Sequence, residues 1–141
     1  ENPLFRFGWA YYLTYAGRTG DVLSALEPVD SASPSVFWSQ VSRVLKRIAQ
    51  GDREEAMALL TEDIVTALRI DGLMSCYLAT MYAMLDDHDN TIDALENAVD
   101  LGFINYPYLS QHDRFLRRLR GNERMEKLLE RVKHEWENLE L

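Results

Sequence analysis

Few side chains in this sequence could do chemistry, and their spacing does not bring them together. His88, His112 and His134 lie far apart and have no cysteine or carboxylate partner at the spacing of metal ligands. Cys76 is the single cysteine, and no motif of an activated nucleophile surrounds it or any serine. We therefore expect no catalytic residue, no metal site and no cofactor, and we interpret the chain as a non-enzymatic protein.

Composition narrows the class of partner. The 141 residues are 47% hydrophobic, enough for a buried core, and the net charge of −8 argues against nucleic acid, whose binding needs Lys and Arg on the phosphates. One cysteine excludes an internal disulfide, which fits a reducing, cytoplasmic setting.

Charged residues interrupt every apolar run before the roughly 20 residues that span a bilayer, so we expect no membrane insertion. Because the chain begins at Glu1 without a methionine, we expect a fragment of a longer protein.

A repeat of short turns organises the chain. Gly17-Arg18, Gly51-Asp52 and Asp86-Asp87 follow one another at intervals of 34 and 35 residues. In this register a small or β-branched residue precedes each turn by seven positions, and a leucine follows each turn by nine. These columns are Ala10, Val44 and Ala79, and Leu26, Leu60 and Leu95. A small residue on one helix lets its partner approach closely, so the period indicates helical hairpins that stack side by side.

Hydrophobic periodicity and capping residues predict helices and no strand. Pro3 can open the first helix, Ser33 with Pro34 the next long one, and Asp71 and Asp89 can cap two more. Thr61 interrupts and re-caps the chain after the second turn. We predict an all-α fold with helices over residues 3–16, 19–26, 34–49, 53–60, 62–69, 72–85, 90–101, 113–119 and 123–138.

The C-terminal third resembles a known family. The run from Leu95 to Pro107, LENAVDLGFINYP, followed by His112 to Leu116 and by Arg120-Gly121, is similar to the closing segment of tetratricopeptide (TPR) arrays. Such arrays end bacterial regulatory proteins, notably eukaryote-like serine/threonine kinases and some adenylate-cyclase-like or transcriptional regulators. None of the kinase motifs is present in this chain, which has no Gly-rich phosphate loop and no Asp-Phe-Gly.

The resemblance implies a right-handed TPR-type superhelix of antiparallel helix pairs. We expect a single domain over residues 1–141, with repeat units at about 3–33, 34–70 and 71–102 and a C-terminal capping segment at 103–141. Arg43 and Arg47 occupy columns that are usually apolar in the family, so the helix that carries them can be rotated by one residue.

The resemblance also places a concave groove on the first helix of each pair. Its partner-binding positions would be Leu4, Phe7, Tyr11, Tyr15, Trp38, Leu73, Cys76, Thr80 and Met84, with Val41, Leu45 and Ile48 either beside them or in the core. Exposed, these side chains would form an apolar patch of the kind that marks a protein interface. The alternative is that they are ordinary core. The Lys, Asn and Arg clamp of chaperone-binding relatives is absent.

One basic cluster stands out in the acidic chain, formed by Arg114, Arg117, Arg118, Arg120 and Arg124. It could meet an acidic partner or the acidic flank of the array. The simpler interpretation is a solvated helix face that pairs with Glu123, Glu126 and Glu130.

Together these patterns predict a protein-protein interaction scaffold, the C-terminal TPR module of a bacterial signalling or regulatory protein, which binds a peptide or helix in an apolar groove. The alternative is a module that self-associates as a homodimer, or docks on an upstream kinase or cyclase domain and regulates it.

Overall fold

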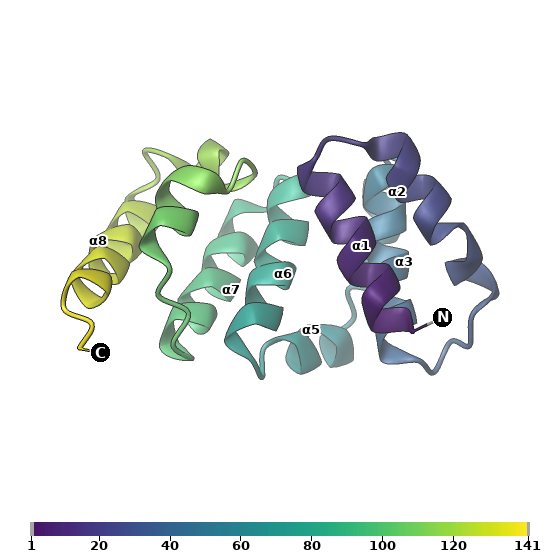
Figure 1. The fold of residues 1–141 in the computed structure, drawn as a ribbon, viewed down its shortest axis with the longest axis horizontal. Coiled ribbons are helices and arrows are strands. Elements are labelled where there is room, and N and C mark those ends of the chain that lie inside the picture. Colours follow the sequence, from purple (N-terminus) through teal and green to yellow (C-terminus); the bar gives the residue numbers. More distant parts are fainter. Residues whose placement is uncertain (1, 141) are drawn as a thin grey trace. The chain divides into compact units, whose positions relative to one another are not determined.

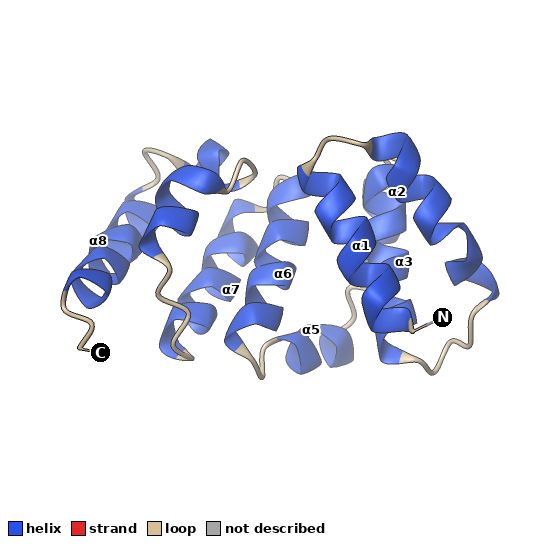
Figure 2. Cartoon of the chain, viewed as in Figure 1, coloured by secondary structure: helices blue, strands red, loops and turns tan. Residues whose placement is uncertain are grey.

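The computed structural model describes residues 2–140, and every regular element in that range is helical (Figures 1 and 2). The all-α prediction is confirmed for this part of the chain. The chain divides into two compact units, 1–66 and 67–141, which are described separately below. No helix in the described range combines the length and apolar character needed to cross a membrane.

The first unit is built on two helix pairs. Its elements are α1 (Pro3–Tyr15), α2 (Thr19–Leu26), a 3-10 helix η1 (Glu27–Ser31), α3 (Phe37–Ala49) and α4 (Arg53–Leu59), and α5 (Glu62–Leu68) runs across the boundary between the units. α1 packs against α2 and α3, and α3 packs against α4. The core they enclose consists of fully buried apolar residues, among them Phe7, Ala10, Leu13, Val22, Leu26, Val41, Val44, Leu45 and Ala56.

The second unit contains one long helix pair and a C-terminal segment. Its elements are α6 (Gly72–Met84), α7 (His88–Asp100), a π-helix η2 (Tyr108–His112), a 3-10 helix η3 (Leu116–Leu119) and α8 (Glu123–Glu137). α6 and α7 pack along each other, and Ser75 Oγ donates to the Ala94 carbonyl at 2.7 Å. Gly72 allows the first residue of α6 to lie close to α7, because an added Cβ would lie 3.3 Å from the Ala98 carbonyl oxygen.

The three predicted turns share one backbone conformation. Gly17, Gly51 and Asp86 have φ values of 71°, 75° and 55°, in the left-handed region that glycine tolerates best. In each turn the following N–H donates to the carbonyl five residues back, at 3.0, 2.9 and 3.0 Å, as in a Schellman helix end. α1, α3 and α6, the helices that end at these turns, are each 13 residues long. The period read from the sequence is therefore a period in local structure.

Capping side chains begin most helices where the sequence predicted. Asp71 accepts from the N–H groups of Leu73 and Met74, and Thr61 Oγ1 accepts from Ile64 N–H at 3.4 Å. Asp113 caps η3 through the N–H groups of Phe115 and Leu116.

Three predicted helix starts were wrong. The segment predicted as a helix over 113–119 becomes helical only at Leu116, in the 3-10 helix η3. α7 begins at His88, because Asp87 and not Asp89 accepts from the Asn90 N–H at 3.2 Å. α3 begins at Phe37 and not at Pro34. Ser33 Oγ lies 2.9 Å from Ser35 Oγ, and the Val36 N–H donates to the Ser33 carbonyl at 3.3 Å, so residues 33 to 36 form a turn.

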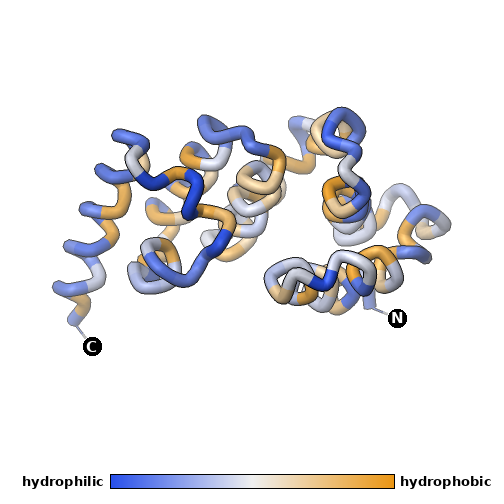
Figure 3. Tube along the Cα trace, turned by 90° about the horizontal axis from the view of Figure 1, so that it is seen from above, coloured by the Kyte–Doolittle hydropathy of each residue, from blue (hydrophilic) through white to orange (hydrophobic). Residues whose placement is uncertain are grey.

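The C-terminal helix is held against α7 by apolar contact and by ion pairs. Hydrophilic and hydrophobic residues alternate along α8 in Figure 3, and Met125, Leu128 and Val132 are its buried residues. Arg124 pairs with Asp93 at 2.6 Å and Glu96 at 3.0 Å, and both contacts raise the pKa of its guanidinium.

Two of the five arginines of the basic cluster meet the acidic flank of the preceding helix pair. Arg118 pairs with Asp86 at 2.5 Å, and Arg124 pairs with two carboxylates of α7. The predicted pairing with Glu123, Glu126 and Glu130 is not the one observed for these two arginines.

Candidate protein-interaction surface

Helix α1 carries the most exposed aromatic surface of the first unit, and its start is well defined. Asn2 Oδ1 accepts from the Leu4 N–H at 2.9 Å, and Pro3 occupies the first helical position, where its missing N–H costs nothing. One face of the helix is buried through Phe7, Ala10 and Leu13, at 0%, 0% and 1% exposure. The rest of the helix is therefore free to present side chains outward.

Phe7 anchors an aromatic cluster that joins α1 to α3. Its ring centroid lies 5.2 Å from that of Trp38 and 5.7 Å from that of Tyr11, both tilted. Phe37 meets Trp38 edge-on at 5.2 Å. Rings at these separations gain from their quadrupoles beyond simple burial. Phe7 itself is fully buried, so it supports Tyr11 and Trp38 and offers no surface to a partner.

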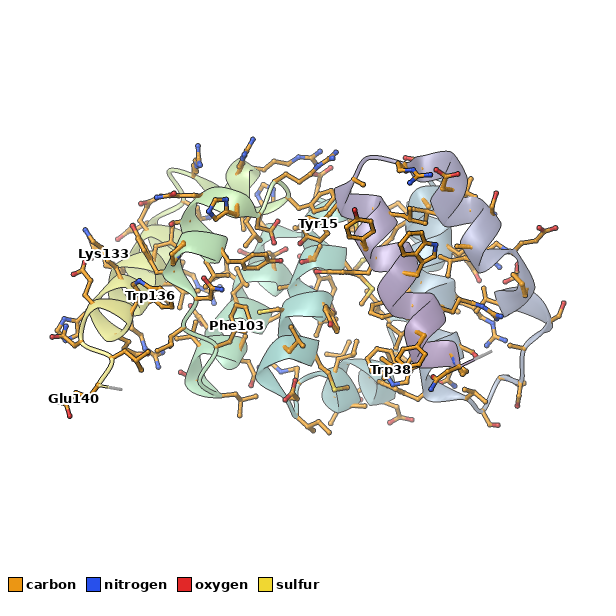
Figure 4. All side chains as sticks on the ribbon, in the orientation of Figure 1. Tyr15, Trp38, Phe103, Lys133, Trp136 and Glu140 are labelled. Carbon is orange, nitrogen blue, oxygen red and sulfur yellow. The ribbon has the colours of Figure 1, made fainter. Side chains whose placement is uncertain are left out.

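Tyr11 and Tyr15 continue the cluster toward the end of α1. Their rings lie 5.1 Å apart and their hydroxyl oxygens 3.2 Å apart, within hydrogen-bond distance. Both side chains are half-buried, as is Trp38. Figure 4 labels Tyr15 near the C-terminal end of α1 and Trp38 near the start of α3. Tyr11, Tyr15 and Trp38 are thus each held by a neighbouring ring and remain partly exposed to solvent.

The expected groove positions in α6 fall into two groups. Leu73 is 51% exposed and Met84 is half-buried, whereas Cys76 and Thr80 are buried at 4% and 2% exposure. Burial raises the pKa of the Cys76 thiol to about 12, and the carboxylates of Asp113 and Asp71 add to this. Cys76 is therefore a protonated core thiol at neutral pH.

In α3, the choice between groove and core is settled for two residues. Val41 and Leu45 are fully buried, and Ile48 is half-buried. Of the nine expected partner-binding side chains, Phe7, Cys76 and Thr80 are buried in the same way. The accessible ones are Leu4, Tyr11, Tyr15, Trp38, Leu73 and Met84.

Sequence reasoning missed a second exposed face of α1. Phe5, Trp9 and Tyr12 are 72%, 54% and 59% exposed, and the rings of Trp9 and Tyr12 stack at 5.5 Å with an interplanar angle of 21°. The signal was present, because these residues recur at i, i+4 and i+7 and so share one side of a helix. An apolar pattern almost all round the helix concealed which side would be exposed.

α1 carries little charge, although the chain as a whole is acidic. Arg6 is the one charged residue between Pro3 and Tyr15. Groups of His, Cys, Asp and Glu that could hold a metal ion are absent from residues 2–140. What the surface offers is aromatic area and two tyrosine hydroxyls, which suit an apolar partner with a few polar groups.

The chain matches no family model, and no curated protein and no solved structure is similar to it at a significant level. Function is therefore inferred from the contacts described above.

Proposed function

We propose that this chain is a protein-protein interaction scaffold of the TPR type, which binds a helix or peptide of a partner protein through Tyr11, Tyr15 and Trp38. The observation that carries the proposal is a row of three half-buried aromatic side chains. The buried Phe7 ring contacts Tyr11 and Trp38, and Tyr11 contacts Tyr15. Aromatic anchors of this kind supply most of the binding free energy in protein interfaces.

The TPR assignment is supported by the repeat of local structure. Three helices of equal length end at left-handed turns spaced by 34 and 35 residues, which matches the period of roughly 34 in TPR arrays. The likeness of the LENAVDLGFINYP run to the closing segment of bacterial TPR arrays points the same way. In this proposal the helix pairs stack as a right-handed superhelix, and the module serves a bacterial signalling or regulatory protein.

The chemistry of the surface favours a partner helix or strand with large apolar side chains. Rigid rings lose little conformational entropy on binding, because a tyrosine or tryptophan has two side-chain torsions and Phe7 already restricts those of Tyr11 and Trp38.

The test compares partner capture by the wild-type protein with capture by Tyr11→Ala and Trp38→Ala variants. Each substitution should weaken binding by about 2 kcal/mol, roughly thirtyfold in Kd, if the aromatic row is the anchor. The matched control is Trp136→Ala, which removes an exposed tryptophan, 42% exposed, from α8. Circular dichroism verifies the fold of each variant.

Undiminished capture by folded Tyr11→Ala and Trp38→Ala variants would contradict the proposal. So would an equal loss in the Trp136→Ala control.

A further inference from the structure

The outer stripe of α1, defined as Phe5, Gly8, Trp9 and Tyr12, has the form of one half of a helix-helix interface. These four positions stand at i, i+3, i+4 and i+7, the four corners of the hole that receives a side chain in knobs-into-holes packing. Three corners are exposed aromatic side chains. The fourth corner is a glycine, so the hole is open.

Gly8 has no role in the packing of its own chain. A Cβ built at Gly8 would meet no atom within 4 Å, and its φ is not among the positive values. Glycine is nonetheless the weakest helix former after proline, so alanine would suit this helix interior better. A glycine in such a place makes physical sense where another backbone or a bulky side chain approaches closely.

We propose that the outer stripe of α1 binds the outer stripe of a second copy of this chain, in an antiparallel helix pair. A two-fold axis passes between Gly8 and Trp9, the midpoint of the stripe. Phe5 of one copy then faces Tyr12 of the other, and each Trp9 ring enters the hole over the other copy's Gly8. An interface of this kind must be self-complementary, and an aromatic stripe with a central notch satisfies that condition.

Charge allows a second copy to approach at this face. Each copy carries a net charge of −8, so two copies repel each other across most of their surfaces. α1 contains no acidic residue, and its one charged residue is Arg6. The outer stripe is therefore a surface of this acidic chain on which a second copy meets no carboxylate from the facing helix.

The buried area fits a weak dimer. At roughly 200 Å² for each aromatic side chain, the exposed fractions of Phe5, Trp9 and Tyr12 offer about 370 Å² per copy. Two copies together offer about 740 Å², below the ~1,000 Å² at which stable specific interfaces begin and within the range of weak, transient contacts.

Sedimentation equilibrium of the purified protein from about 5 to about 500 µM tests this inference. Wild type should pass from monomer to dimer within the series. Trp9→Glu and Gly8→Leu should each raise the dimer Kd by at least about tenfold, the first by placing a carboxylate on the axis and the second by filling the hole. The control Trp136→Glu, a change of the same chemistry at the exposed tryptophan of α8, should leave the Kd unchanged.

Gly8→Leu keeps the test decisive if Trp9→Glu fails to fold. The added Cβ meets no atom of its own chain, and leucine has a higher helix propensity than glycine, so the melting temperature of the monomer should rise while association weakens. A wild-type monomer at every concentration overturns the inference and leaves the stripe to a different partner. A dimer that survives Gly8→Leu, or that Trp136→Glu disrupts equally, also overturns it.

The inference stands apart from the proposed partner binding. Tyr11 and Trp38 lie outside the outer stripe, Tyr11 beside its Gly8 edge and Trp38 on α3, so Tyr11→Ala and Trp38→Ala should leave dimerisation intact. Trp9→Glu should leave partner capture intact, because Trp9 stands neither three nor four positions from Tyr11. Capture that persists in Tyr11→Ala and Trp38→Ala would overturn the proposed function, whereas a dimer that persists in Trp9→Glu and Gly8→Leu would overturn this inference.

Discussion

Helices α1 and α6 are built alike and used differently. Both have 13 residues and both end at a left-handed turn, one at Gly17 and the other at Asp86. α1 buries three of its residues, whereas α6 buries eight, including Ser75 and Thr80. Length and ending thus follow from local signals. The fraction of a helix that is buried depends on the elements packed around it.

The buried polar groups of α6 show how such a helix satisfies its hydroxyls. Ser75 Oγ donates to the Ala94 carbonyl and lies 3.1 Å from Asn97 Nδ2, and that amide also donates to the Arg69 carbonyl at 2.9 Å. A buried hydroxyl without a partner would cost stability, so this network is a condition for burying α6. α1 instead presents aromatic side chains to solvent, which costs little for folding and leaves them available for binding.

The largest expected effect contrasts two phenylalanines of α1. Phe7→Ala should lower the free energy of unfolding by about 3–5 kcal/mol, because it empties a fully buried site beneath Trp38. Phe5→Ala, at 72% exposure, should change it by less than about 0.5 kcal/mol. Urea unfolding followed by circular dichroism, at a low concentration that keeps the protein monomeric, measures both. Similar losses from the two substitutions would mean that the outer stripe is not exposed.

A second pair of substitutions repeats the contrast in α6. Leu78→Ala, at 0% exposure, should cost about 2–5 kcal/mol, and Leu73→Ala, at 51% exposure, less than about 0.5 kcal/mol. The same unfolding measurement applies. A small effect at Leu78 would show that α6 is less tightly packed than its burial indicates, and the comparison with α1 would weaken.

The smallest expected effects concern the two turns. Gly17→Ala should destabilise the protein by about 1–2 kcal/mol, because a Cβ is unfavourable at a φ of 71°. Asp86→Gly should stabilise it by about 0.5 kcal/mol, since the gain at a φ of 55° exceeds the loss of the exposed pair with Arg118. Thermal unfolding monitors both variants. The same sign for the two changes would indicate that the turns are not equivalent.

Much of the local structure was predictable because it depends on neighbours in sequence. The turns at Gly17, Gly51 and Asp86, the re-capping at Thr61 and the caps at Asp71 and Asp113 were all anticipated. The starts of α3 and α7 were not. α3 begins at Phe37 without a side-chain cap, so neither serine beside Pro34 marks its start. Before α7, Asp86, Asp87 and Asp89 offer competing caps that the sequence alone does not rank.

The candidate surface was predictable only in part. Tyr11, Tyr15 and Trp38 were named as groove residues and are half-buried. Phe7 was named with them and is buried, while Phe5, Trp9 and Tyr12 were passed over and are exposed. An amphipathic helix such as α8 shows its buried face in its pattern of polar residues. α1 has so few polar residues that its sequence pattern does not indicate which face is buried.

By itself, then, the sequence determined what local energetics control: the helical segments and the left-handed turns at a period near 34. Tertiary structure decided which apolar side chains became core and which remained on the surface. The physical reason is that the hydrophobic effect is non-directional, so it does not select which of several apolar side chains on a helix is buried. Phe5 and Phe7 have the same tendency to leave water, and only the position of α2 and α3 around α1 gives Phe7 a place to go.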